Sequence, residues 1–270
     1  MGRLWRGTGG KGKGKGAASL SLFLSASQYV SSAALEMPVL LARLGPIVGL
    51  LALSALNLSA QDDERLRTDW AWLERYRAEN AALPPAGARR VVFMGNSITQ
   101  AWAPLFPMLF PGREYIGRGI SGQTTPQMLV RFRQDVVALT PKVVVILAGT
   151  NDIAGNTGPS SIEMIEDNLA SMAEIARANG IRVVLASVLP VDDYPWRRGL
   201  EPAPKIMALN AWMQRYAAEH GAVYLDVHSP MQTAEHGLRR ELTYDGVHPN
   251  EAGYRVMAAL VERAIARALR

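Results

Sequence analysis

Short apolar runs alternate with longer stretches of helical periodicity from about residue 61 to the end of the chain. Four runs are almost continuously apolar, which predicts strands that are buried on both faces. They are Val91–Met94, Val143–Leu147, Ile181–Val188 and Val223–Val227, and Tyr115–Ile116 is a weaker fifth run.

Helical patterns lie before the first run and between the later ones. Arg67–Asn80 carries Trp70, Leu73 and Tyr76 at helical spacing and predicts an amphipathic helix that ends before Pro84. Further helices are predicted over Thr124–Leu139, Ser161–Asn179, Pro204–His220 and Glu251–Leu269. Strands that alternate with helices indicate βαβ units, so the expected fold is α/β, a three-layer α/β/α sandwich around a parallel sheet.

The first 60 residues have a different character. Residues 9–16 read GGKGKGKG, a tract with nothing to pack. From Met37 the chain has a basic residue (Arg43), a short apolar stretch and small residues up to Ala60, the form of a secretory signal peptide. We expect cleavage after Ala60 and a periplasmic or secreted protein, with an uncleaved N-terminal membrane anchor as the alternative. We also expect Met37 to be the natural start, residues 1–36 to be an over-extended reading frame, and residues 61–270 to form a single domain.

Composition and charge narrow the function. The chain has no cysteine, which excludes disulfides, thiolate metal sites and a cysteine nucleophile. Residues 1–60 hold six basic side chains and one acidic one, which accounts for the whole formal charge of +5. The predicted domain is therefore neutral overall, and its charge does not support a nucleic-acid partner.

Polar residues follow three of the predicted strands. They are Asn96–Ser97, Ser121–Gly122 and Asn151–Asp152. Because the carboxyl ends of parallel strands meet at one edge of the sheet, where ligand sites gather, this convergence predicts a functional site.

Each of these clusters also has an ordinary structural interpretation. Ser97 would expose its hydroxyl at a helix start that favours negative charge, or it would simply cap a turn. Gly122 would bring its backbone N–H close to a substrate oxygen, or belong to a loop whose threonines cap the next helix. Asn151 would donate to an oxyanion, or make an Asx turn, with Asp152 supporting the loop.

A histidine in a suitable setting follows near the C-terminus. Asp245 precedes His248 by three residues, so a turn can place the carboxylate on the Nδ1–H and leave Nε2 to deprotonate a serine. His220, His228 and His236 lack such a setting: His220 is expected at a helix C-terminus and the others in packing or surface roles. No histidine pair shows a metal-ligand spacing, so no metal is expected.

Together, these segments over Arg90 to about Leu269 resemble the conserved blocks of the SGNH hydrolases, also called GDSL esterases and lipases. The resemblance matches Ser97 to the family's serine, Gly122 to its glycine, Asn151 to its asparagine, and Asp245 and His248 to its Asp-x-x-His. It implies a flavodoxin-like sheet of five parallel strands, no cofactor, and hydrolysis of acyl esters. The subgroup that it is most similar to contains lysophospholipase L1-like and acetylhydrolase-like esterases.

Two residues depart from the family pattern. Asn96 stands where the family has aspartate, which keeps the hydrogen-bonding shape but removes the charge. Gly117 stands where many relatives carry asparagine, so any support from that side chain is lost.

The resulting expectation is a serine esterase with a Ser97–His248–Asp245 triad and an oxyanion hole of Ser97, Gly122 and Asn151. Short acyl esters of small molecules or polysaccharides are the expected substrates. The alternatives are a lysophospholipase or thioesterase for longer chains, and an inactive glycan-binding envelope protein. The loop after the fourth strand could wall the pocket with Tyr194 and Trp196, and Arg197 and Arg198 could meet an anionic head group or only water.

Overall fold

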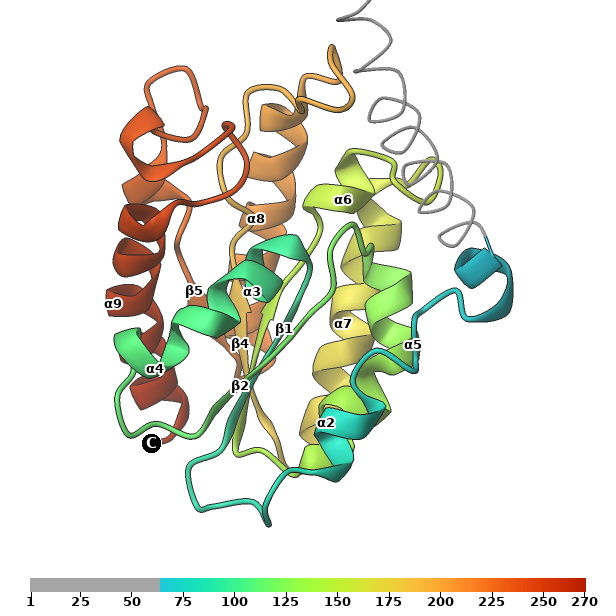
Figure 1. Cartoon of the computed structure of the whole chain (residues 1–270). Helices are drawn as coiled ribbons and strands as arrows, with labels where there is room; N and C mark the ends of the chain where they lie inside the picture. The colour runs from blue at the N-terminus through green and yellow to red at the C-terminus, as the bar shows by residue number, and fades with distance from the viewer. Residues whose placement is uncertain (1–63) are drawn as a thin grey trace, which may run out of the picture. The chain divides into compact units, whose positions relative to one another are not determined.

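A computed structural model describes residues 64–270, and a single parallel sheet with helices on both faces forms its centre (Figure 1). The strand order is β2-β1-β3-β4-β5, and every neighbouring pair is parallel. The strands are β1 (Val91–Gly95), β2 (Tyr115–Gly119), β3 (Val143–Leu147), β4 (Arg182–Ala186) and β5 (Val223–Leu225). The three-layer α/β/α sandwich with five parallel strands is confirmed. The predicted leader, signal peptide and cleavage site at 1–60 lie outside the described residues.

Helices α5, α7 and α8 cover one face of the sheet, and α3, α4 and α9 cover the other (Figure 1). The helices are α2 (Arg77–Ala81), α3 (Ser97–Trp102), α4 (Phe106–Leu109), α5 (Thr125–Asp135), α6 (Thr150–Ile153), α7 (Ile162–Ala178), α8 (Pro202–Glu219) and α9 (Glu251–Ala268). Short 3₁₀ turns lie at Ala103–Leu105, Val137–Leu139, Ser229–Met231 and Arg240–Leu242. None of the helices within 64–270 combines the length and the hydropathy that crossing a bilayer requires.

The central strands are apolar throughout because both of their faces are covered. Val92 and Met94 of β1 pack into the core on the α5–α7–α8 side, whereas Val91 and Phe93 pack into the core on the α3–α9 side. All five residues of β1 and all five of β3 are buried. This explains the continuous apolar runs in the sequence.

Strand β2 extends beyond the two apolar residues that predicted it, and two of its further residues are glycines that let α3 and the 3₁₀ turn after it approach closely. A Cβ atom at Gly117 would lie 2.3 Å from the Cβ of Ala103. One at Gly119 would lie 2.2 Å from the backbone nitrogen of Gln100. A larger residue at 117, such as the asparagine of many relatives, would therefore require this contact to open. At the other side of the sheet, β4 and β5 both end two residues earlier than predicted.

The continuous helix predicted over Arg67–Asn80 is wrong. The chain turns at Trp72, which has a φ of 53°, and helix α2 begins only at Arg77. The Asp69 carboxylate accepts hydrogen bonds from the backbone of Leu73 at 2.7 Å and of Glu74 at 3.0 Å, which stabilises a turn instead of a helix.

Three glutamines in or next to α5 donate hydrogen bonds to backbone carbonyls of this irregular stretch. Gln123, Gln127 and Gln134 donate to the carbonyls of Ala71, Trp70 and Leu73 at 2.7, 2.8 and 2.6 Å. These tertiary contacts override the helical periodicity. The four later helices were predicted correctly, although α5 proper stops at Asp135 and continues only as a 3₁₀ turn.

Candidate active site

Ser97 is the first residue of α3, directly after β1. The side chain of Asn96 accepts a hydrogen bond from the backbone N–H of Ile98 at 3.0 Å and so caps this helix. Asn96 is almost fully buried. Since an asparagine oxygen can make this bond, the turn does not need the aspartate that the family pattern has there.

His248 and Asp245 reach Ser97 from the other end of the chain. The His248 Nε2 atom lies 3.0 Å from the Ser97 hydroxyl oxygen, and the His248 Nδ1 atom lies 2.7 Å from Asp245 Oδ2. The other oxygen of Asp245 accepts from the backbone N–H of Val247 at 3.0 Å and of His248 at 2.8 Å. This turn fixes the carboxylate against the imidazole, so the structure brings the three predicted residues together.

The charge of Asp245 is stabilised by this turn. Partial burial by itself would raise the pKa of the Asp245 carboxyl, but the hydrogen bonds from the backbone and ring of His248 and from the backbone of Val247 outweigh it and lower the pKa. The carboxylate is therefore ionised throughout the range in which a histidine titrates.

Two of the backbone donors expected for the oxyanion hole have no acceptor among residues 64–270. Within the described chain, the N–H groups of Ser97 and Gly122 donate to no protein atom. Gly122 has a φ of 75°, and a Cβ atom there would meet nothing within 4 Å. The left-handed backbone favours glycine at this position, and no protein side chain fills the space around it.

Asn151 lies in α6, after β3, and is buried. Its side-chain nitrogen donates to the carbonyl oxygen of Gln123 at 2.9 Å. An amide nitrogen has two hydrogens, so a second one is left for another acceptor. This places a third donor beside the loop that carries Gly122.

Asp152, the next residue of α6, links this helix to the start of α5. Its carboxylate accepts from the backbone N–H of Thr125 at 2.9 Å and from the Thr125 hydroxyl at 2.5 Å. Burial raises the pKa of Asp152, and the Thr125 hydrogen bonds oppose that rise. The supporting role expected for Asp152 agrees with these contacts.

A buried arginine that the sequence analysis missed lies behind these loops. The guanidinium of Arg131 donates from Nη2 to the carbonyl of Gly95 at 2.9 Å and from Nε to the side-chain oxygen of Gln123 at 2.6 Å. Its Nη1 pairs with Asp135 at 2.9 Å, and both side chains are fully buried. Arg131 therefore ties the carboxyl end of β1 to the loop that carries Gly122.

A sequence signal for this arginine did exist. Arg131 and Asp135 lie four residues apart on the face of α5 that also carries the core residues Met128 and Phe132. Charged residues are rare at core positions of a helix unless they are paired and hydrogen-bonded, so two opposite charges there indicate a buried ion pair. Its position in the periodic pattern, rather than its residue type, marks it.

A cleft of about 490 Å³ opens at Ser97 and His248. Its wall is mixed: Ala101, Leu105, Pro249 and Tyr254 contribute apolar surface, and Gln100, Ser121, Tyr244 and Glu251 contribute polar groups. A ligand in this cleft would contact the hydroxyl and the imidazole directly.

The two aromatic residues predicted for the substrate loop behave differently. Trp196 is partly exposed and its ring centre lies 6.1 Å from that of His248. Tyr194 has no exposed surface, and its hydroxyl is hydrogen-bonded to Thr150, so the expectation that Tyr194 walls the pocket is wrong. Arg197 donates to the carbonyls of Ala154 and Gly155.

Of the four histidines, all of which lie in the described part of the chain, only His248 lines the cleft at Ser97. His220 ends α8 as expected, His228 is buried, and His236 is on an exposed turn. Among residues 64–270, no group of three or more His, Asp or Glu side chains is arranged to hold a metal ion.

The sequence and the fold are both similar to those of known esterases and lipases. Residues 86–256 match the GDSL-like Lipase/Acylhydrolase family. The solved structure of a GDSL-like lipase from Bacteroides thetaiotaomicron is 48% identical, with 74% of this chain and 100% of that chain covered and a TM-score of 0.72.

Two curated relatives are more distant. An acetylxylan esterase from Xylanibacter ruminicola is 26% identical over 75% of this chain and 47% of its own length. Esterase TesA from Pseudomonas aeruginosa is 25% identical over 61% of this chain and 81% of its own length. The chain thus spans about half the length of the first of these two relatives.

The match covers well over half of the chain, and the chain belongs to the GDSL-like lipase/acylhydrolase family, whose members are carboxylic ester hydrolases. The resemblance stated from the sequence motifs is confirmed.

Proposed function

We propose that the protein is a serine esterase in which Ser97 is the nucleophile and His248 its general base. The observation that carries this proposal is the 3.0 Å contact between the Ser97 hydroxyl and His248 Nε2, with Asp245 on the other ring nitrogen. His248 removes the hydroxyl proton as the oxygen attacks the ester carbonyl, and then protonates the leaving alcohol. Water, deprotonated by the same imidazole, releases the acid and restores Ser97.

The oxyanion of the tetrahedral intermediate would be held by three donors: the backbone N–H groups of Ser97 and Gly122 and the side-chain N–H of Asn151. Support comes from residues 64–270, among which the two backbone groups have no acceptor and the second side-chain hydrogen of Asn151 is unused. Donors that are fixed before the reaction stabilise developing charge without further reorganisation.

Short acyl groups, such as acetyl, on a carbohydrate alcohol fit the cleft best. Its polar groups interrupt the apolar surface that a long acyl chain would need to bury. Trp196 and Tyr244 are exposed aromatic side chains near the base, and flat aromatic faces suit the apolar faces of sugar rings. The similarity to an acetylxylan esterase points to the same class of substrate.

A series of p-nitrophenyl esters from acetate to palmitate tests this function. We expect kcat/KM to be highest for acetate or propionate and to fall steadily with chain length. A maximum at eight or more carbons would favour the lysophospholipase or thioesterase alternative. An absence of hydrolysis with every ester, by folded protein, would favour the glycan-binding alternative.

We also propose that the protein is exported, with cleavage after Ala60 by a signal peptidase. The basic, apolar and small-residue pattern of residues 37–60 supports this. Esters of extracellular polysaccharides would then be within reach of the enzyme.

A further inference from the structure

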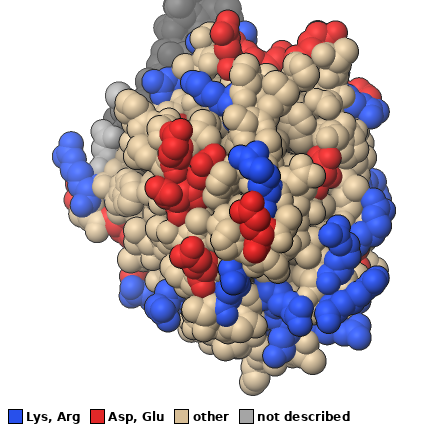
Figure 2. Space-filling model, turned by 180° about the vertical axis from the view of Figure 1, so that it is seen from behind, with Lys and Arg blue, Asp and Glu red and all other residues tan. Residues whose placement is uncertain are grey.

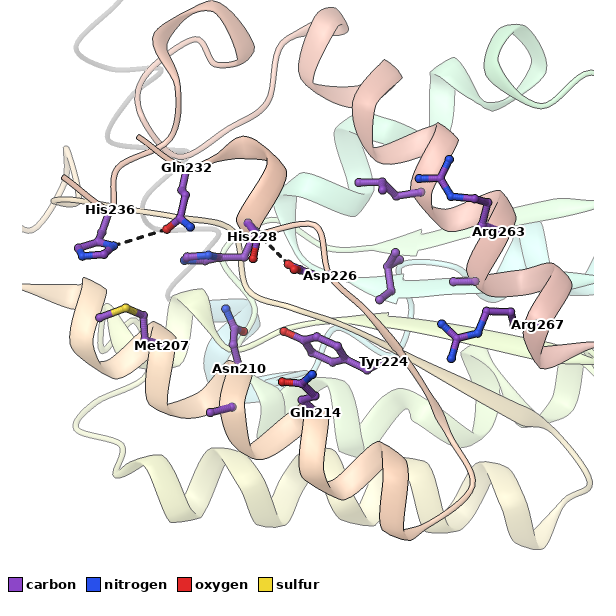
Figure 3. A pocket seen from close by; sticks show the side chains of 15 residues that line it. Met207, Asn210, Gln214, Tyr224, Asp226, His228, Gln232, His236, Arg263 and Arg267 are labelled. Atoms are coloured by element: carbon purple, nitrogen blue, oxygen red, sulfur yellow. Dashed lines mark hydrogen bonds between the residues drawn. The ribbon is translucent and has the colours of Figure 1, made fainter. Parts of the chain in front are cut away.

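A second pocket, separate from the catalytic cleft, lies beside β5 between α8 and α9 (Figure 3). Its volume is about 630 Å³, larger than the cleft at Ser97. Among residues 64–270, strand β5 forms the edge of the sheet and pairs only with β4, so no further described strand separates the two helices here. The proposed ester hydrolysis gives this pocket no role.

Two arginines of α9 supply the charge of this pocket. Arg263 and Arg267 are one helical turn apart and therefore project from the same side of the helix. Within the described residues neither makes an ion pair, whereas Arg255 of the same helix pairs with Glu251 at 2.6 Å. Figure 2 shows basic side chains gathered toward the side of the rear face where α9 lies, with acidic ones mainly on the other side. The two guanidinium groups are thus available to an anion.

The pocket offers very little opposing negative charge. Asp226 is the acidic residue among those that line it, and one of its carboxylate oxygens already accepts from the backbone N–H of Ser229 at 2.9 Å. An anionic group bound at the arginines would therefore meet a net positive surface.

The deeper part of the pocket is polar but uncharged. His228 is only 7% exposed, and within the described chain its ring nitrogens bond to no protein atom. Burial lowers the pKa of His228, so its neutral ring offers one donor and one acceptor. Burial also raises the pKa of Tyr224 to about 12, so its hydroxyl stays protonated.

On the α8 side of the pocket, the side chain of Asn210 is fixed by hydrogen bonds to the backbone. The side chain of Asn210 accepts from the backbone N–H of Val188 at 2.7 Å and donates to its carbonyl at 3.0 Å. Gln214, one turn further along α8, also lines the pocket, and its side chain makes no hydrogen bond within the described part of the chain. Figure 3 shows Tyr224 between the α8 side and the arginines of α9.

We propose that this pocket binds a sugar that carries an anionic group, with the carboxylate or phosphate on Arg263 and Arg267 and the hydroxyls on His228, Tyr224 and Gln214. Neutral donors and acceptors beside paired cations match the two kinds of group in such a ligand. The volume fits one or two sugar rings. The proposal concerns binding and does not depend on the catalytic role of Ser97.

Isothermal titration calorimetry of the full chain tests it with four probes at low ionic strength: D-glucuronate, glucose 6-phosphate, xylose and inorganic phosphate. We expect at least one anionic sugar to bind about tenfold or more tightly than xylose and inorganic phosphate, and to weaken as salt is added. If only glucuronate binds tightly, the arginines recognise a carboxylate. If only glucose 6-phosphate does, they recognise a phosphate. If inorganic phosphate bound as tightly as the anionic sugars, the sugar part of the proposal would be overturned. If neither anionic sugar bound more tightly than xylose, the whole proposal would be overturned.

Matched variants locate the site. The double variant Arg263→Ala/Arg267→Ala should lose about tenfold in affinity or more, and Arg255→Ala on the same helix should keep it. Tyr224→Phe, which removes only a hydroxyl, should weaken the anionic sugar. The double variant should retain wild-type hydrolysis of p-nitrophenyl acetate and its melting temperature, so a failure of this proposal is distinguishable from a failure of the esterase proposal. Unchanged binding in the double variant would place the ligand elsewhere.

Discussion

The side-chain nitrogen of Asn151 donates a hydrogen bond to the backbone carbonyl of Gln123, 2.9 Å away. The side-chain oxygen of Gln123 in turn accepts from Arg131 at 2.6 Å, and Arg131 also donates to Gly95. The proposed oxyanion donors are therefore held by one buried network that reaches from β1 to α6. This network suggests which substitutions should change the rate of hydrolysis and which should change only stability.

Replacing Asn151 by alanine should lower kcat by about 10²- to 10³-fold with little change in KM, because this donor bonds the oxyanion most strongly in the transition state. Steady-state kinetics with p-nitrophenyl acetate measure this. Asn179→Ala, at the exposed end of α7, is the control and should behave as wild type. A kcat within twofold of wild type for Asn151→Ala would remove Asn151 from the proposed site.

Arg131→Lys should lower kcat by about ten- to a hundredfold while KM stays nearly constant, because a lysine cannot hold Gly95, Gln123 and Asp135 at once. Arg90→Lys is the matched control. Arg90 is also buried, pairs with Glu114 and donates to two carbonyls, but it precedes β1 at the opposite edge of the sheet.

Both variants should have a lower melting temperature than wild type in thermal unfolding. Only Arg131→Lys should have a lower kcat. Equal kcat values in the two folded variants would assign Arg131 a purely structural role.

The pH dependence of kcat/KM should show a single ionisation on the acid side. His248 must be neutral to accept a proton, so activity is lost as the pH falls and the imidazole is protonated. Asp245 adds no second step in that range because hydrogen bonds lower its pKa below that of an ordinary carboxyl. The logarithm of kcat/KM should therefore rise with a slope of one and then level off. A slope near two would mean that another group titrates with the histidine.

Export should be visible in a Gram-negative host that expresses the chain from Met37. The expected product is a periplasmic protein whose N-terminus is Gln61 or a residue next to it, because the small residues up to Ala60 suit a signal peptidase. N-terminal sequencing and cell fractionation measure this. An intact leader on membrane-bound protein would instead support the anchor.

The sequence predicted the layers of the fold well because both faces of the sheet are covered. Strands such as Val143–Leu147 must then be apolar at every position, and that pattern is easily read. Strand β2 gave a weak signal because Gly117 and Gly119 make room for α3 and carry no apolar side chain. The helix expected near Trp72 failed because side chains of a distant segment, among them Gln123, bind its backbone.

The candidate site was predicted where local spacing carries the information. The turn from Asp245 to His248 is encoded within four residues. Its approach to Ser97 depends on the packing of α9 against α3, where the Tyr254 hydroxyl donates to the carbonyl of Ile98. Arg131 was missed because its partners are separated from it by up to 36 residues and include a backbone carbonyl, which no residue type reveals. Tyr194 was misassigned because a loop position in sequence does not tell which side chains turn inward.

In the proposed mechanism Ser97 and His248 act as one unit, and a comparison of single and double variants tests this coupling. The kcat/KM for p-nitrophenyl acetate should fall by about 10⁶-fold in Ser97→Ala and in His248→Ala, and by about 10⁴-fold in Asp245→Ala, since aspartate only orients and stabilises the imidazole. We expect the double variant Ser97→Ala/His248→Ala to be no slower than either single variant, because losing one member already disables the pair. Losses that multiply in the double variant, or a folded Ser97→Ala protein that hydrolyses the ester at the wild-type rate, would contradict this mechanism.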